Sequence, residues 1–241
     1  MGEIAVRMAA SLVALILVAA AVPVRAQSPA QSSSSSSSSK RAKTPASASD
    51  SALDSGTVSN GVYRNAGLGF TCRIPAGWVL RTEEMNARDE VAPAKDDRAA
   101  PAKAGEGGCP HAEGCGRVLL AAFSRPPEAR GEDVNGSIVI AAESAAAYPG
   151  LKDAAQYFGP VGEIAKAQGF EVVEEPYEFA IGTKTVVRGD FQKNVGSRVM
   201  RQSTLAVLAR GYVVSFTFIG GTEDEVEELV AGLSFGAAKS K

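Results

Sequence analysis

Residues 205–218 read LAVLARGYVVSFTF and decide the fold, because their pattern predicts two paired β-strands. In the second half of this stretch the large apolar side chains occupy alternate positions, namely Tyr212, Val214, Phe216 and Phe218. Ser215 and Thr217 lie between them. This period of two is typical of a strand that is buried on one face.

The first half of the stretch predicts the partner strand and the turn. Leu205 and Val207 are the apolar positions of the partner strand. Arg210-Gly211 follows at the point where the chain must reverse, and glycine tolerates the positive φ that a tight turn requires. The sequence therefore predicts a hairpin.

Further strands are expected upstream of the hairpin. Alternating residues predict one strand through Tyr177, Phe179 and Ile181, and a second through Thr185, Val187, Gly189 and Phe191. With the hairpin, these make four successive antiparallel strands. Two apolar runs, Val118 to Phe123 and Ile138 to Ala142, are also strand-like.

Two helical segments complete the expected fold. Thr222 to Leu233 begins with a capping box of Thr222 and Glu225, followed by apolar residues at helical spacing, Val226, Leu229, Val230 and Leu233. The second segment, Leu151 to Gln168, is interrupted by Gly159, Pro160 and Gly162, which predict a kink or two short helices. This order of elements predicts an α+β domain in which one antiparallel β-sheet is flanked by helices.

The N-terminus has the three-part pattern of a cleavable export signal. It carries Arg7, an apolar stretch over residues 8–22, and small residues up to a predicted cleavage site after Ala26. The apolar stretch is about 15 residues long, whereas a spanning helix needs about 20. No cysteine follows as a lipid acceptor. We expect a soluble, secreted or periplasmic protein with no transmembrane span after cleavage.

Composition divides the rest of the chain. Residues 27–60 contain eight consecutive serines and few large apolar residues, so we expect a disordered linker. Residues 61–238 are long enough for a single domain. Within it, residues 82–116 have neither a helical nor a strand period, and we expect them to form a flexible surface insertion.

The charge balance excludes one class of partner. Without residues 1–26 the chain has 23 basic and 26 acidic residues, which give a net charge of −3. The basic residues of the folded part are scattered singly, without the clusters that bind phosphate backbones. We expect no nucleic-acid partner.

Two short stretches resemble a known family. Tyr63-Arg-Asn65, Leu68-Gly-Phe70 and Ile74-Pro-Ala-Gly-Trp78 are similar to the first hairpin of PsbP-like proteins, named after the extrinsic P subunit of photosystem II. Residues 210–235 resemble the end of that superfamily. The resemblance implies a PsbP-like α/β/α sandwich and a non-enzymatic accessory role, usually binding another protein at a membrane or in an exported compartment. No functional residues are carried over, because fold alone does not give function.

Cys109, His111 and Cys115 form the one local cluster of potential metal ligands. Their spacing matches no common zinc motif, and a fourth ligand is not evident nearby. In an oxidising compartment Cys109 and Cys115 can close a small disulfide loop, which we favour over free thiols or a metal site. The remaining cysteine, Cys72, lies on a predicted strand, where we expect a small buried hydrophobe.

Familiar catalytic arrangements are not evident. His111 is the one histidine of the chain and lies in the expected insertion, whereas a general base must be held rigidly. Glutamates cluster at residues 171–178 and 223–228, but without the spacing of a calcium loop. Trp78 is expected in the core.

These observations favour an exported accessory or binding module of the cell envelope that contacts another protein, with no enzymatic activity and no cofactor. A metal or redox protein that uses the Cys109/His111/Cys115 loop is the first alternative. A hydrolase with an unrecognised site is the second. The sequence leaves the oligomeric state open.

Overall fold

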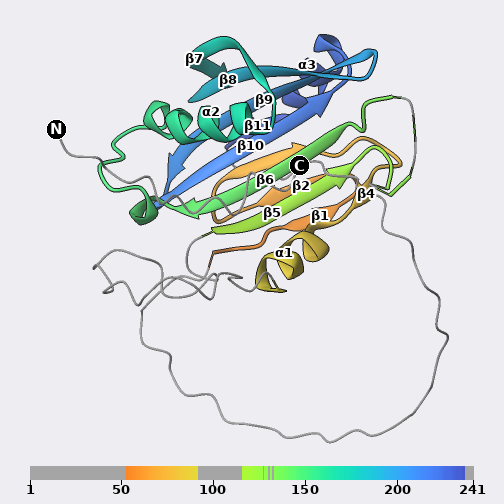
Figure 1. The fold of residues 1–241 in the computed structure, drawn as a ribbon. Helices are drawn as coiled ribbons and strands as arrows, with labels where there is room; N and C mark the ends of the chain where they lie inside the picture. The colour runs from red at the N-terminus through yellow and green to blue at the C-terminus, as the bar shows by residue number, and fades with distance from the viewer. Residues whose placement is uncertain (1–52, 92–115, 127, 130, 132, 237–241) are drawn as a thin grey trace, which may run out of the picture.

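The computed structural model describes residues 53–91, 116–126, 128, 129, 131 and 133–236, and they form two antiparallel sheets with three α-helices (Figure 1). The larger sheet has seven strands in the order β4 (Val79–Leu80), β5 (Gly116–Phe123), β6 (Ser137–Ser144), β10 (Tyr212–Gly220), β9 (Arg198–Ala209), β8 (Lys184–Val195) and β7 (Glu171–Ile181). The smaller sheet has four, in the order β1 (Thr57–Ser59), β2 (Val62–Asn65), β3 (Phe70–Arg73) and β11 (Leu233–Phe235). The helices are α1 (Thr82–Val91), α2 (Phe158–Ala167) and α3 (Glu223–Val230), with short 3₁₀ turns η2 (Ala145–Ala147) and η3 (Ala155–Tyr157).

The hairpin predicted from residues 205–218 is confirmed. β9 and β10 pair antiparallel with Phe216 opposite Leu205, and the turn residues Arg210 and Gly211 have φ values of 52° and 82°. β7, β8, β9 and β10 follow one another as four antiparallel neighbours, as predicted. The runs at 118–123 and 138–142 are β5 and β6.

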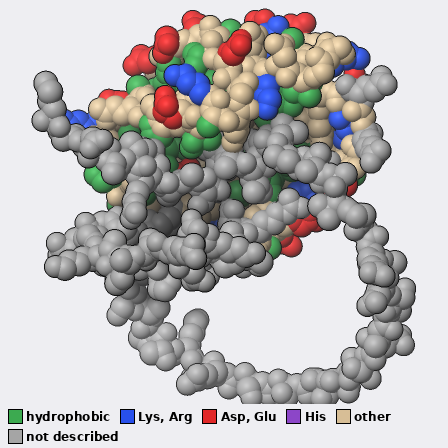
Figure 2. Space-filling view, in the orientation of Figure 1, with side chains coloured by type: hydrophobic (Ala, Val, Ile, Leu, Met, Phe, Trp, Pro, Cys, Tyr) green, Lys and Arg blue, Asp and Glu red, His purple; other side chains and the backbone are tan. Residues whose placement is uncertain are grey.

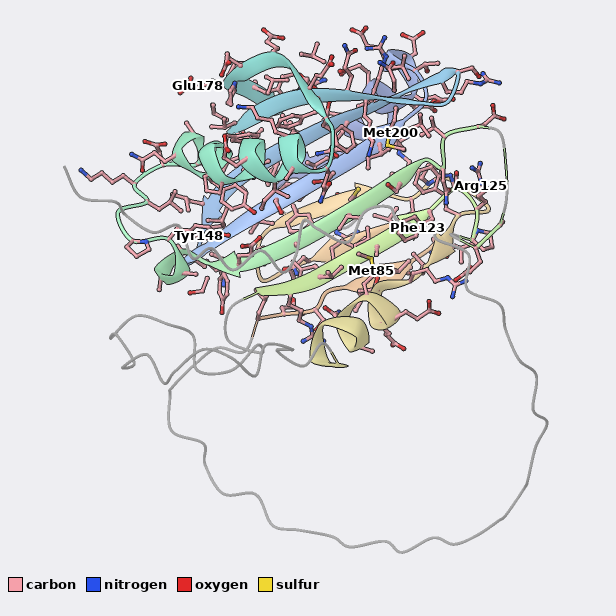
Figure 3. All side chains as sticks on the ribbon, viewed as in Figure 1. Met85, Phe123, Arg125, Tyr148, Glu178 and Met200 are labelled. Carbon is pink, nitrogen blue, oxygen red and sulfur yellow. The ribbon has the colours of Figure 1, made fainter. Side chains whose placement is uncertain are left out.

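The large sheet is covered on both faces. One face packs against α3 and the small sheet in a core that includes Phe70, Phe216 and Val226. The opposite face carries α2, where Phe158 packs with Val213, and α1, where Met85 packs near Phe123 of β5 (Figure 3). The α+β class is therefore confirmed, with helices on both sides of the large sheet.

Two details of the predicted sheet are wrong. We expected one sheet, but residues 57–73 and 233–235 form a second, whose strands of three or four residues are too short to show an apolar period. We also expected β10 to be buried on one face. Ser215 and Thr217 lie on the opposite face, and they are only 6% exposed because the segments that carry α1 and α2 cover that face as well.

The predicted insertion at 82–116 is wrong for its first ten residues, which form α1. This helix is fixed by tertiary hydrogen bonds to β5: Thr82 accepts from the Ala121 amide at 2.9 Å, and the Asn86 side chain bonds both the N–H and the C=O of Val118 at 3.0 Å. Such bonds leave no period in the sequence. Residues 92–115 lie outside the described residues.

The domain also begins earlier than predicted. β1 lies inside the expected linker at 27–60, and Leu53 packs against the core. The Tyr63 hydroxyl donates to the Ser55 carbonyl at 2.9 Å, which fastens this entry segment. The expected signal peptide and residues 27–52 of the linker lie outside the part that the structure describes.

The predicted helices are largely confirmed. Thr222 and Glu225 form the capping box, but α3 ends at Val230, and Leu233 pairs with Cys72 in β11 instead of continuing the helix. The segment predicted at 151–168 forms η3 and then α2, but Gly159, Pro160 and Gly162, which were expected to interrupt it, lie within α2. Across the described part of the chain, no helix has both the length and the apolar character that a membrane crossing requires.

Cys72 is fully buried, as predicted, and burial raises the pKa of its thiol to about 12, against a smaller opposing effect of Arg73. Because the thiolate is the reactive form, we expect Cys72 to resist iodoacetamide at pH 8 in the folded protein and to react after unfolding in urea. Peptide mapping by mass spectrometry measures this. Rapid labelling of Cys72 in the native protein would contradict its buried position.

Candidate functional site

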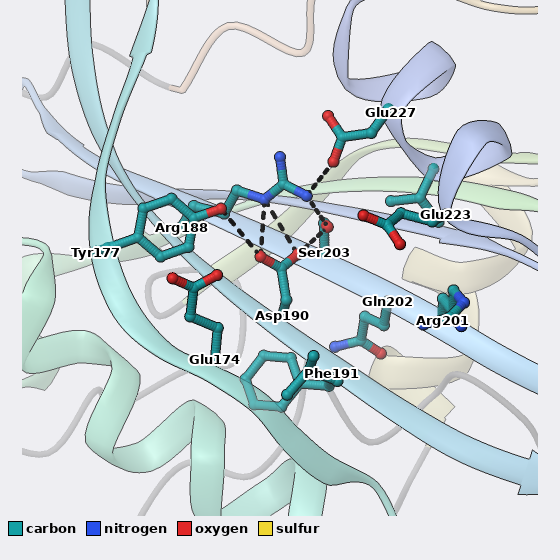
Figure 4. A pocket seen from close by; sticks show the side chains of 12 residues that line it. Glu174, Tyr177, Arg188, Asp190, Phe191, Arg201, Gln202, Ser203, Glu223 and Glu227 are labelled. Atoms are coloured by element: carbon teal, nitrogen blue, oxygen red, sulfur yellow. Dashed lines mark hydrogen bonds and ion pairs between the residues drawn. The ribbon is translucent and has the colours of Figure 1, made fainter.

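A polar cavity of about 190 Å³ lies between β7, β8, β9 and α3, and we call it the β7–α3 cavity (Figure 4). It is the candidate functional site because charged side chains converge in it from four elements. Its lining consists of Val173, Glu174, Tyr177, Arg188, Asp190, Phe191, Arg201, Gln202, Ser203, Glu223, Val226 and Glu227.

Arg188 is the centre of the cavity's hydrogen-bond network and is only 6% exposed. Its Nε donates to both carboxylate oxygens of Asp190 at 3.0 Å. Its Nη2 donates to the Ser203 hydroxyl at 2.9 Å and to the Glu227 carboxylate. The Phe179 ring lies under the guanidinium, 5.0 Å from its carbon to the ring centroid, which adds a cation–π contact. The cation is thereby compensated from several sides.

Asp190 receives two further donors. The Ser203 hydroxyl donates to one of its oxygens, and the Tyr177 hydroxyl donates to the other at 3.2 Å. Ser203 thus donates to Asp190 and accepts from Arg188, so its hydroxyl is engaged in holding the network. This arrangement fixes the shape of the cavity.

Strand register places these groups together. Arg188 and Asp190 are two residues apart on β8 and so point to the same face. Asp190 is paired with Ser203 of β9, and Arg188 with Tyr177 of β7. Glu227 reaches the same point from α3, which the Thr222 capping box begins. Three strands and one helix thus converge on Arg188.

The protonation states follow from these contacts. Burial lowers the pKa of Arg188, but its bonds to Glu227 and Asp190 raise it more, so that the pKa lies above the usual value and the side chain stays cationic. Burial and the charge of Asp190 raise the pKa of Tyr177 to about 12. Tyr177 therefore remains a hydrogen-bond donor at neutral pH.

The surroundings of the cavity are acidic. β7 has the sequence EVVEEPYEFAI and α3 the sequence EDEVEELV, which together contain nine acidic and no basic residues. Figure 2 shows acidic side chains gathered at the top of the molecule, where Figure 1 places β7 and α3. Glu178 is exposed at this end (Figure 3). The lining itself has four carboxylates and two guanidiniums, a net charge of −2.

A second polar cluster is buried near the other end of the large sheet. Glu143 of β6 is 6% exposed and accepts hydrogen bonds from the hydroxyls of Tyr157, at 2.8 Å, and Tyr148. Burial and the nearby Glu143 carboxylate raise the pKa of both tyrosines. Two protonated phenols thus hold a carboxylate under η2 and η3, and we assign this cluster to stability.

We expect Tyr157→Phe to lower the free energy of unfolding by about 1–3 kcal/mol, because it leaves one oxygen of a buried carboxylate without its donor. Urea denaturation followed by circular dichroism measures the change. Tyr212→Phe is the control at a half-buried tyrosine outside this cluster, expected to change stability by less than about 0.5 kcal/mol. Equal effects of the two substitutions would remove the role given to the Glu143 cluster.

The residues predicted as a site from the sequence are not among those that the structure describes. Cys109, His111 and Cys115 fall outside the described residues, so the Cys109–Cys115 disulfide and the alternative metal site stay predictions. Within the described residues no group of three or more His, Cys, Asp or Glu side chains could hold a metal ion. Trp78, expected in the core, is partly buried against it.

The sequence analysis missed Arg188, Asp190 and Ser203. A signal was present, because the two opposite charges occupy alternate positions of a strand whose other positions, Val187 and Phe191, are apolar. From the sequence alone, Arg188 and Asp190 fall on the strand face opposite the apolar residues, which is normally exposed to solvent. The structure shows that Glu227 of α3 reaches over that face, with Tyr177 and Phe179 of the neighbouring strand β7 beside the pair, so that the pair is part-buried.

Comparison with known proteins finds structural similarity only. Neither a protein-family model nor a curated protein matches the sequence. A protein of unknown function from Pseudomonas aeruginosa is 21% identical, with 45% of this chain and 72% of that chain covered and a TM-score of 0.32. LpqN of Mycobacterium tuberculosis, described as involved in cell envelope biogenesis, is 12% identical, with 70% and 83% covered and a TM-score of 0.32.

The cyanobacterial PsbP of Synechocystis is 16% identical, with 72% of this chain and 91% of that chain covered and a TM-score of 0.38. A PsbP structure is thus among the solved structures that are similar to this chain.

Proposed function

We propose that this chain is an exported, non-enzymatic binding module that contacts a protein partner at the β7–α3 cavity. The observation that carries the proposal is the cavity itself: a polar hollow whose walls are fixed by the Arg188 network and whose mouth is flanked by β7 and α3.

The size of the cavity favours a macromolecular partner. Pockets that enclose a whole small-molecule ligand have volumes of about 300–1,000 Å³. A cavity of about 190 Å³ is smaller and suits one side chain projecting from a larger surface. The long edge strand β7 and the exposed face of α3 offer such a surface around it.

The polar groups of the cavity are already hydrogen-bonded to one another, which favours binding over catalysis. Two hydroxyls of the lining lie beside a carboxylate: Ser203 both donates to Asp190 and accepts from Arg188, and Tyr177 donates to Asp190. A nucleophile must reach its substrate and have a base ready to take its proton, whereas Ser203 is only 2% exposed and Asp190 is already paired with Arg188. The observed hydrogen bonds of Ser203 instead hold the side chains of Asp190 and Arg188 in position.

Export is supported by the signal-like pattern at residues 1–26 and is tested by mass spectrometry of the protein from the exported fraction, under non-reducing conditions. We expect the mass of the chain from Gln27, less two hydrogen atoms for the Cys109–Cys115 disulfide. A mass that includes residues 1–26 would contradict cleavage. A metal adduct lost on denaturation, with free thiols, would instead support the alternative metal site at Cys109, His111 and Cys115.

Partner binding is tested by photo-crosslinking in the source cells. A photoreactive amino acid replaces Val173, which lines the cavity and is 53% exposed, or Val58, which is 43% exposed on β1 of the small sheet. We expect a discrete protein adduct from position 173 and none of that mass from position 58. The same adducts from both positions, or none from 173, would contradict partner binding at the cavity.

A further inference from the structure

We infer that the β7–α3 cavity receives the cationic side chain of a lysine or arginine from the partner protein. The inference rests on the proposed function and adds the chemistry of recognition. It follows from three properties of the cavity: an apolar wall, an excess of carboxylates, and two carboxylates that the internal network leaves available.

The apolar wall suits the stem of a long basic side chain. Val173 lines the cavity with half of its surface exposed, and Val226 and Phe191 are buried residues of the same lining. Lysine and arginine pack their methylene stems along such surfaces while the charged head reaches a polar region. A short polar side chain would leave Val173 in contact with water.

The charges of the lining select a cation. Arg188 is compensated by Asp190 and Glu227, so it offers little attraction to an anion. The remaining charged groups of the lining are Glu174, Glu223 and Arg201, and the net charge of the whole lining is −2. The nine acidic residues of β7 and α3 extend the same sign over the surrounding surface, which steers a basic partner to this end of the molecule.

Glu174 and Glu223 are the two carboxylates that would meet the incoming charge. Both are exposed, and among the described residues neither makes a side-chain hydrogen bond or ion pair, whereas Asp190 and Glu227 are committed to Arg188. Figure 4 shows Glu174 and Glu223 on opposite sides of the network, from β7 and α3. A cation that meets either carboxylate leaves the hydrogen bonds of Arg188 in place.

The chain supplies a matched control for each of these two residues. Glu175 is the exposed neighbour of Glu174 on β7, and Asp224 is the exposed neighbour of Glu223 in the first turn of α3. Neither lines the cavity. A cavity substitution and its control therefore each remove one negative charge from the same element. Asp224→Asn also matches the effect of Glu223→Gln on the helix dipole.

The experiment titrates the ¹⁵N-labelled chain from Gln27 to Lys241 with the peptide acetyl-Ala-Ala-Arg-Ala-Ala-amide and follows amide shifts by NMR. We expect saturable shifts at the residues of the cavity, weaker binding at higher salt, and no such shifts with the citrulline peptide, which keeps the shape and lacks the charge. Glu174→Gln and Glu223→Gln should each raise Kd about three- to fivefold, as for an exposed ion pair. Glu175→Gln and Asp224→Asn should leave Kd within about twofold, since neither side chain lines the cavity.

The inference would be overturned by equal binding of the citrulline peptide, by equal effects of the cavity and control substitutions, or by shifts confined to other parts of the surface. Absence of binding would also overturn it. The photo-crosslink at position 173 is independent of peptide binding. A discrete adduct there with no binding of the arginine peptide would retain the partner and reject the cationic side chain, whereas loss of the adduct would reject the proposed function itself.

Discussion

Arg188→Ala is expected to lower the free energy of unfolding by about 3 kcal/mol. The substitution leaves Asp190, whose side chain is 18% exposed, without its two-bond partner and removes a donor from Ser203 and Glu227. Breaking a buried ion pair by removing one member costs about 3–5 kcal/mol, and the partial exposure of Asp190 and Glu227 places this case at the lower end. Urea denaturation measures the loss.

Arg198→Ala is the control for that prediction. Arg198 pairs with Asp133 at 3.1 Å, but both side chains are more than half exposed. Exposed pairs contribute about 0–1 kcal/mol, so the control should change stability far less. A loss below 1 kcal/mol for Arg188→Ala would show that water replaces the network at little cost, and the cavity would then lack the fixed walls on which the proposed binding depends.

Phe216→Ala is expected to cost about 3–5 kcal/mol, the range for removing a buried aromatic ring. Phe216 is fully buried on the face of β10 that meets the small sheet. Its ring packs edge-on against Phe70, at 4.9 Å between centroids, and against Phe235, at 5.7 Å. These two rings belong to β3 and β11, so the substitution removes an aromatic contact between the two sheets.

The same urea experiment, with Val195→Ala as an exposed control, tests this contact. The control should stay within about 0.5 kcal/mol of the parent protein. We expect a single cooperative transition at lower urea for Phe216→Ala. An unchanged midpoint would contradict the packing of the small sheet against β10.

The sequence predicted the parts of the fold that have a long, regular apolar period or a local chemical signal. β9 and β10 show both, since their alternating residues flank the Arg210-Gly211 turn. The Thr222–Glu225 capping box is a local signal and marked the start of α3 correctly. Strand order among β7, β8, β9 and β10 followed because each strand is joined to the next by a short connection.

The remaining elements depend on contacts between distant segments, which leave no period in the sequence. β11 exists because Leu233 meets Cys72, some 160 residues away in the chain. α1 depends on the bonds of Thr82 and Asn86 to β5. In both cases tertiary partners decide the local structure, and propensity alone gives the wrong answer.

The candidate site was hidden for the same reason. The sequence pattern places Arg188 and Asp190 on the outward face of a strand. In the structure Glu227 of α3 lies over that face and pairs with Arg188. The carboxylates of β7 and α3 were visible as two clusters, but their position around one cavity follows only from the strand order β9, β8, β7 and the packing of α3. Sequence reasoning therefore found the charges without the place where they act.

The most direct test of partner binding at the β7–α3 cavity is the photo-crosslink from position 173 in source cells, compared among the parent chain, Glu223→Gln and Asp224→Asn. We predict one protein adduct, reduced by Glu223→Gln and retained by Asp224→Asn, with no counterpart from position 58. No adduct at position 173 in the parent chain, or the same adduct at positions 173 and 58, would contradict the account.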